Sequence, residues 1–188
     1  VNLLDTRGNG MEFWIAAGIG FIVLFCASIY FVYDACLAAN NMGVDFSQYD
    51  FNRDNEVDLI YIVYAGYGQA DGGDQTTIWP HSWDVTSALY FGYTNQSTYY
   101  VTCDENTWDI IDYNLPSFDG KTLITYACSN ELNHAQKLRD GIGTICHEFC
   151  HLLGLPDYYI TDNAYNHLKN QTPGSWSIMG SGNYLNES

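Results

Sequence analysis

The sequence predicts a mixed α+β fold, because strand-like and helix-like segments follow one another without repeats or a linker. Residues 57–64 are rich in β-branched and aromatic side chains, which is typical of a buried strand. Residues 89–93 and 98–102 are predicted to form a strand pair around a turn at 94–96, and residues 122–128 to form a further strand.

Two helices complete this prediction. Residues 31–40 have the composition of a helix inside the domain, and a second helix is expected just after Asp140, whose side chain can cap it. The second helix carries the motif on which the functional interpretation depends.

That motif runs from His147 to Asp157 and reads H-E-x-x-H-x-x-G-x-x-D. On a helix, His147 and His151 lie one turn apart on the same face, so both imidazoles can bind one zinc ion, and Glu148 can reach a water molecule on that ion. Gly154 can take the backbone conformation that ends a helix sharply, after which the chain turns back and offers Asp157 as a third ligand. Three protein ligands with one open position are typical of a catalytic zinc.

Three alternatives stay open at this motif. His167 lies beyond the turn and can replace Asp157 as the third ligand. An amphipathic helix with two buried histidines would contain the same run, but it leaves Gly154 and the aspartate unexplained. Cys146 and Cys150 form C-x-x-x-C-H, one residue longer than the c-type haem signature, although packing as small apolar groups behind the helix accounts for them better.

A second segment, S-W-S-I-M-G at residues 175–180, places a methionine in a tight turn after the motif. Together with residues 143–159, 44–68 and 77–83, it resembles the immune inhibitor A family of secreted bacterial metallopeptidases. The resemblance implies a metzincin-like catalytic domain, with a twisted sheet, a backing helix and an active-site helix. It also implies a zinc-dependent endopeptidase that is exported to the extracellular space or cell envelope and acts on proteins or peptides. Since such a domain continues further, we expect residues 31–188 to be a partial catalytic domain, cut at both ends from a larger precursor.

In such a site Glu148 is the expected general base, taking a proton from the attacking water and passing it to the leaving amine. Met179 would form an apolar floor beneath the imidazoles, which is a packing role. Tyr184, five residues beyond Met179, is a candidate for holding a ligand or the oxyanion. Tyr158 and Tyr159 compete for that role, and aromatic packing explains all three tyrosines without it.

An acidic loop predicts a second metal. Asp50, Asn52, Asp54 and Asp58 stand at positions 1, 3, 5 and 9 of an EF-hand spacing, and Glu56 at position 7 would contribute its backbone carbonyl to calcium. An asparagine replaces the usual glycine at position 6, and it tolerates the left-handed backbone that the turn requires. The alternative is a solvated acidic turn in front of a strand.

Composition limits the classes of partner. Six basic against 22 acidic residues give a net charge of −16, which excludes nucleic acid as a partner and attracts divalent cations. Six cysteines are too few for a disulfide scaffold, and spacing does not support a single bridge through Cys103 or Cys128. His81 and His134 are interpreted as structural or surface residues rather than ligands.

The N-terminal segment is ambiguous. Residues 13–33 are a run of 21 residues without a charge, which as a helix would span about 31 Å, the thickness of a bilayer core. One interpretation makes residues 1–30 a membrane anchor through which the chain associates with a membrane. The other makes the run a buried core helix, because a metzincin needs a first strand before the helix at 31–40.

Two functions of different class follow. One is an extracellular zinc endopeptidase, and the other is a catalytically inactive zinc-binding module for protein interaction or adhesion. The intact Glu148 favours the enzyme, since an inactive module does not need a general base.

Overall fold

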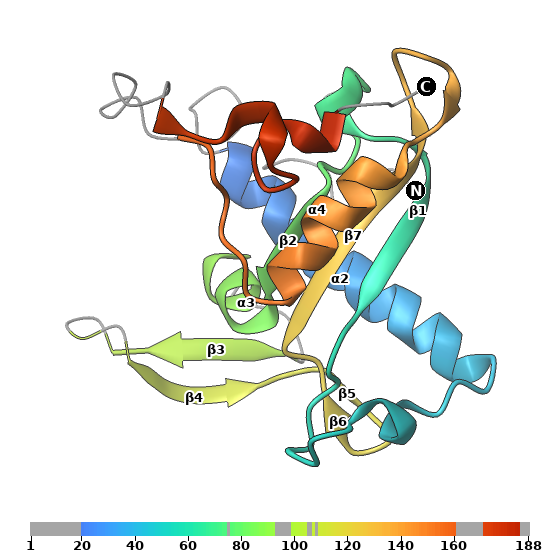
Figure 1. The fold of residues 1–188 in the computed structure, drawn as a ribbon. Helices are drawn as coiled ribbons and strands as arrows, with labels where there is room; N and C mark the ends of the chain where they lie inside the picture. The colour runs from blue at the N-terminus through green and yellow to red at the C-terminus, as the bar shows by residue number, and fades with distance from the viewer. Residues whose placement is uncertain are drawn as a thin grey trace. The chain divides into compact units, whose positions relative to one another are not determined.

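The computed structural model describes residues 20–74, 76–92, 99–104, 107, 109–160 and 171–184 (Figure 1). Helices and short strands are mixed along this part of the chain, so the predicted mixed class is confirmed. The chain divides into two compact units, Val1–Ile62 with Trp83–Tyr126, and Val63–Ser82 with Ala127–Ser188. Each unit is described by itself below.

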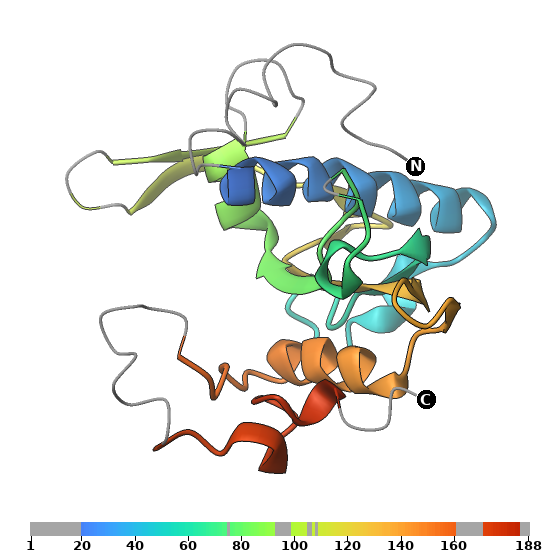
Figure 2. The same cartoon turned by 90° about the horizontal axis from the view of Figure 1, so that it is seen from above.

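The first unit is built on two helices and two short hairpins. Helices α2 (Gly20–Asn41) and α3 (Val85–Gly92) pack side by side (Figure 2). Strand β3 (Tyr100–Cys103) pairs antiparallel with β4 (Ile110–Asn114), and β5 (Ser117–Phe118) with β6 (Lys121–Thr122). Their apolar side chains, with those of the short helix η1 (Phe46–Tyr49), form one buried cluster of Val32, Cys36, Phe46, Val57, Ile60, Val85, Ala88, Leu89, Val101, Leu115, Phe118, Leu123 and Tyr126.

Helix α2 contains the end of the apolar N-terminal run. Residues 13–19 of that run lie outside the described residues, and α2 continues across residue 30, where the sequence analysis placed a boundary. Val32 and Cys36 of α2 are 0% and 4% exposed in the core of the first unit. Of the helices in the described ranges, none is long and apolar enough to cross a membrane.

The strand predicted at residues 89–93 is wrong, because residues 89–92 belong to α3, and residue 93 lies outside the described residues. The carboxylate of Asp84 accepts hydrogen bonds from the backbone N–H of Ser87, at 2.7 Å, and from the hydroxyl of Thr86, as a helix cap does. Val85 and Leu89 then stand one turn apart on the buried side, which is the period of a helix. The predicted partner strand exists as β3 but pairs with β4, and the turn predicted at 94–96 lies outside the described residues.

Two other strands differ in their limits from the prediction. β1 covers Tyr61–Tyr67 rather than 57–64, because Asp58 is still part of the acidic loop, where its N–H donates to the carbonyl of Tyr49. The strand predicted at 122–128 is divided into β6 and β7 (Thr125–Asn133), since the N–H of Leu123 donates to the carbonyl of Pro116.

The second unit joins a small sheet to the helix that carries the motif. The strand order is β1-β7-β2, with β2 at His81–Asp84 and β8 (Leu138–Arg139) pairing antiparallel with β7. Helix α4 (Ile142–Leu152) lies alongside β7 in both views (Figures 1 and 2). Short 3₁₀ helices η2 (Gln69–Asp71), η4 (Gly174–Trp176) and η5 (Gly182–Tyr184) complete this unit.

The predicted cap of the motif helix is wrong in one detail. The N-cap of α4 is Gly141, which makes no side-chain cap bond. Asp140 belongs to the preceding hairpin instead, where its N–H donates to the carbonyl of Glu131 and its carboxylate accepts from the amide of Asn133 at 3.4 Å.

Candidate metal centre

Helix α4 buries its polar side rather than its apolar side. His147 is 5% exposed and Glu148 and Thr144 are 8% exposed, whereas Ile142 is 74% exposed. A helix that served only packing would bury the isoleucine and expose the charged group. His151 stands four residues after His147 on the same face, with the two rings perpendicular and their centroids 4.8 Å apart.

The turn at Gly154 ends the helix and orients the second histidine. Gly154 has φ +87°, a left-handed conformation that glycine adopts without a steric penalty, and the N–H of Leu155 donates back to the carbonyl of Cys150 at 3.1 Å. This turn carries the carbonyl of Leu155 under the helix, where it accepts a hydrogen bond from Nδ1 of His151 at 2.7 Å.

The first histidine is oriented from a distant segment. The carbonyl of Ile178, in the turn that follows η4, accepts a hydrogen bond from Nδ1 of His147 at 2.7 Å. The neighbouring Met179 is 1% exposed, and its carbonyl accepts from the N–H of Tyr158 at 2.7 Å. The turn that contains Ile178 and Met179 therefore orients His147 and fixes the segment next to Asp157.

Three potential ligand atoms converge as a result. Nε2 of His147 and Nε2 of His151 are 3.2 Å apart, and Oδ1 of Asp157 is 3.2 Å from the first and 3.3 Å from the second. Within the described ranges, these three residues are the one group of histidine, cysteine or acidic side chains whose ligand atoms gather closely enough to hold a metal ion.

The hydrogen bonds of the imidazoles determine what these atoms offer. Each Nδ1 faces a carbonyl oxygen, which only accepts, so each Nδ1 carries the ring proton, and Nε2 of the neutral ring has a free electron pair. When both rings are neutral, two electron pairs and a carboxylate oxygen face one another within about 3.3 Å. Such a set repels itself unless a cation lies among the three atoms, and neutral imidazole with carboxylate is the donor set that divalent transition metals prefer.

Glu148 is the remaining acidic group at this site. Burial, and secondarily the nearby charge of Asp157, raise the pKa of Glu148 from 4.5 to about 8. Glu148 therefore takes up and gives up a proton in the range around neutral pH, rather than near pH 4.5 as an exposed glutamate does.

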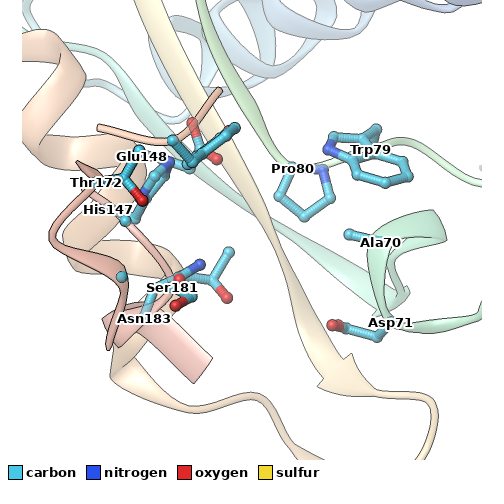
Figure 3. Close-up of a pocket in the computed structure, with 13 residues that line it drawn as sticks. Ala70, Asp71, Trp79, Pro80, His147, Glu148, Thr172, Ser181 and Asn183 are labelled. Carbon is cyan, nitrogen blue, oxygen red and sulfur yellow. The ribbon is translucent and has the colours of Figure 1, made fainter. Parts of the chain in front are cut away.

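A cavity of about 340 Å³ adjoins the two buried side chains of the motif (Figure 3). One wall comes from α4 and the segments after it, with Glu148 and His147, and Figure 3 shows the other wall formed by the region of η2 and β2. The cavity is lined by Ala70, Asp71, Trp79, Pro80, Thr144, His147, Glu148, Tyr159, Thr172, Gly174, Gly180, Ser181 and Asn183.

Comparison with known proteins assigns this arrangement to a family. A family model described as "Immune inhibitor A peptidase M6, catalytic domain" matches residues 43–188. The chain belongs to the immune inhibitor A peptidase M6 family. Immune inhibitor A of Bacillus thuringiensis subsp. alesti is 29% identical over 170 residues, which cover 81% of this chain and 21% of that protein. The chain thus spans about a fifth of the length of the relative it matches, and family membership makes its domain that of a metallopeptidase.

The three tyrosines proposed near the metal centre differ in their positions. The ring of Tyr159 lies nearly parallel to the imidazole of His147, with centroids 6.2 Å apart. Tyr158 is 43% exposed. The side chain of Tyr184, and the whole of His167, lie outside the described residues.

The other histidines and cysteines stay away from the ligand cluster. His81 is 6% exposed and donates from Nδ1 to the carbonyl of Trp79 at 2.7 Å, and the ring of His134 meets that of Tyr67 edge-on. The described cysteines are free thiols: Cys36, Cys103, Cys128, Cys146 and Cys150.

The acidic loop, which belongs to the first unit, is bound by the ammonium group of a lysine in β6. Nζ of Lys121 is 2.7 Å from Oδ2 of Asp50 and 3.1 Å from Oδ1 of Asn55, and this contact lowers the pKa of Asp50. Asn55 has φ +68°, the left-handed conformation that the sequence predicts there. The carboxylate of Asp58 accepts from the N–H of Phe51 at 2.7 Å. Calcium at this loop stays a prediction.

Sequence reasoning missed the opposite wall of the cavity. Asp71 and Trp79 come from segments that precede the motif by more than 60 residues, and Asn183 follows the methionine turn. The one local signal was the A-D-G-G-D loop at residues 70–74, since a glycine-rich loop after a strand often lies at a site. The carbonyls of Leu155 and Ile178 were also missed, because any residue type supplies a carbonyl.

Proposed function

We propose that this chain is the catalytic part of a zinc-dependent endopeptidase of metzincin-like architecture that hydrolyses proteins outside the cell. The observation that carries the proposal is the triangle of His147, His151 and Asp157, with Glu148 buried beside it on the same helix. Export rests on the resemblance of the sequence to secreted metallopeptidases, and the acidic composition agrees with it.

Zinc fits the dimensions of the triangle. Four ligands arranged tetrahedrally at 2.0–2.1 Å from zinc lie about 3.3 Å from one another. The three edges of the triangle measure 3.2, 3.2 and 3.3 Å. Three protein ligands leave the fourth tetrahedral position open, which is the pattern of a catalytic rather than a structural zinc.

In this proposal zinc, when bound, polarises the carbonyl of the scissile peptide bond and lowers the pKa of water. Glu148 takes the proton of the attacking water on its carboxylate and delivers it to the nitrogen of the leaving amine. The carbonyls of Ile178 and Leu155 keep His147 and His151 in the Nδ1–H form and hold their rings in place. The buried position of Glu148 excludes bulk water, which keeps its proton affinity high.

The first prediction separates catalysis from metal binding at Glu148. Glu148→Gln has the same size but does not accept a proton, so we expect zinc to be retained and hydrolysis of denatured casein to fall about a hundred- to ten-thousand-fold. Zinc content by mass spectrometry and casein hydrolysis are measured on the same preparations. Asp74→Asn, an exposed residue of the second unit, is the control for the loss of one charge.

The same two measurements identify the third ligand and test the enzyme against the inactive module. Asp157→Asn is expected to weaken zinc binding, whereas full zinc in this variant would move the third ligand to His167 or elsewhere. One zinc in the wild-type chain without any hydrolysis would overturn the enzyme and leave a zinc-binding module.

A further inference from the structure

Asp71 places a carboxylate on the cavity wall that faces the metal centre. It is the last residue of η2, and Gly72 after it has φ +82°, which ends this short helix. Figure 3 shows the side chain of Asp71 directed from η2 toward the wall that carries Ser181 and Asn183.

This carboxylate has an incomplete set of partners. Its Oδ2 accepts from the amide of Asn130 at 2.7 Å, and within the described ranges no lysine or arginine forms an ion pair with it. Burial raises the pKa of Asp71 and the like charge of Asp140 adds to this, whereas the hydrogen bond from Asn130 and, more weakly, His134 act in the opposite direction. A half-buried carboxylate in such surroundings gains from a cationic ligand.

A second acceptor faces the same cavity. Asn183 is 5% exposed, and its Oδ1 has no hydrogen-bond partner in the described part of the chain. A buried amide oxygen without a donor costs stability, so its retention is a signal that a ligand supplies the donor. The cavity therefore presents acceptors on both walls, and Glu148 also lines it.

The rest of the wall that carries Asp71 suits a long aliphatic stem. Ala70 and Pro80 are apolar, and Trp79 adds an aromatic ring that a guanidinium or ammonium group can also approach favourably. An apolar passage that ends in acceptors matches a side chain with a hydrocarbon stem and a head that only donates hydrogen bonds. Arginine and lysine have this construction.

We infer that this cavity binds a basic side chain of the substrate, arginine or lysine, at the residue next to the scissile bond, with Asp71 as the specificity-determining residue. The inference rests on the proposed function, because the cavity adjoins the metal centre through His147 and Glu148. Arginine is the better fit, since its planar fork has enough donors to reach both Asp71 and Asn183.

The test uses quenched fluorescent peptides that differ at one residue beside the cleaved bond. Arginine is compared with citrulline, which has nearly the same shape but no charge, and with lysine, norleucine and glutamate. We expect kcat/KM for the arginine peptide to exceed that for the citrulline peptide by about 10- to 100-fold, as for a lost charge-assisted contact. Asp71→Asn should abolish the preference, so that the arginine peptide is cleaved no better than the citrulline peptide. Asp74→Asn, three residues further along and exposed, should leave both values unchanged.

The outcomes of this test separate the two proposals. If no peptide is cleaved by the zinc-loaded chain, the proposed function fails. If peptides are cleaved with equal efficiency for arginine and citrulline, the inference about the cavity fails and the enzyme stands. Should Asp71→Asn not fold, the comparison of the two peptides on the wild-type chain decides alone.

Binding of N-acetylarginine amide but not N-acetylcitrulline amide to the Glu148→Gln variant, measured by calorimetry, supplies a readout without turnover. Equal binding of the two would overturn the inference.

Discussion

Gly143 lies directly against the backbone of η5. A Cβ atom at this position would stand 1.9 Å from the carbonyl oxygen of Asn183, far closer than any real contact. The glycine thus permits α4 to touch the segment that forms one wall of the cavity.

The substitution Gly143→Ala tests this contact, because two effects oppose each other. Alanine in a helix gains about 1 kcal/mol over glycine, whereas overpacking against rigid backbone costs about 1–3 kcal/mol. We expect the clash to exceed the gain, so that the free energy of unfolding measured in urea falls by about 1–2 kcal/mol. An increase in stability, as for an exposed helical glycine, would show that α4 and η5 are not packed in this way.

His81 makes the stability of the chain depend on pH. Burial lowers the pKa of His81 from 6.5 to about 4, although its hydrogen bond to the carbonyl of Trp79 acts in the opposite direction. Between pH 4 and 6.5 the unfolded chain binds a proton at this histidine that the folded chain does not. The free energy of unfolding therefore falls as the pH decreases from 6.5 toward 4, and the full contribution of this residue is present above pH 6.5. We expect about 2 kcal/mol less stability at pH 5 than at pH 7.5 from this residue. Urea unfolding of the wild type and of His81→Gln at both pH values gives the difference, and equal pH dependence in the two would contradict it.

Backbone hydrogen bonds and one lysine hold the acidic loop against β6. Two backbone hydrogen bonds join the loop to Thr122, and Lys121 next to it contacts Asp50, whose side chain is 1% exposed. Any calcium ion at this loop would compete with the ammonium group of Lys121 for the same carboxylate oxygen.

We expect Lys121→Met to lower the thermal midpoint of unfolding, because the carboxylate of Asp50 then lacks its ion-pair partner. Added calcium should raise the midpoint of this variant more than that of the wild type. Lys137→Met removes an equal charge from a site over the ring of Tyr67 and is the control. If calcium shifts neither the wild type nor Lys121→Met, the predicted calcium site is wrong.

Zinc should stabilise the chain as a whole, because its three proposed ligands converge only in the folded state. At a free zinc concentration about 100-fold above the dissociation constant, binding to the folded state alone adds about 2.7 kcal/mol to the free energy of unfolding. Urea unfolding with added zinc and with a chelator measures this difference, which should shrink in Asp157→Asn. Identical unfolding curves with zinc and with the chelator would contradict the proposed site.

Local sequence predicted the structure well where the conformation depends on the residue itself, and poorly where contacts with another segment determine it. The turn conformations at Gly154 and Asn55 follow from residue type, and both have the expected positive φ. Residues 89–93 were assigned to a strand because apolar and aromatic residues suit either element, and the cap from Asp84 that starts α3 lies several residues upstream. The limits of β1 were misplaced for a related reason. Val57, Leu59 and Ile60 are apolar, but the N–H of Val57 donates to Thr122 and that of Asp58 to Tyr49 rather than to a neighbour of β1 in its sheet.

The sequence alone determined the convergence of His147, His151 and Asp157. The helical period brings the two histidines together, and one left-handed glycine turns the chain back within eleven residues, and both are properties of a short stretch of chain. Only the tertiary structure determined the contacts around these ligands. The carbonyl of Ile178 that orients His147, and the opposite wall with Asp71, come from segments whose positions depend on packing between distant parts of the chain. Spacing in sequence does not encode such contacts, because a loop of any length can bring the same residues together.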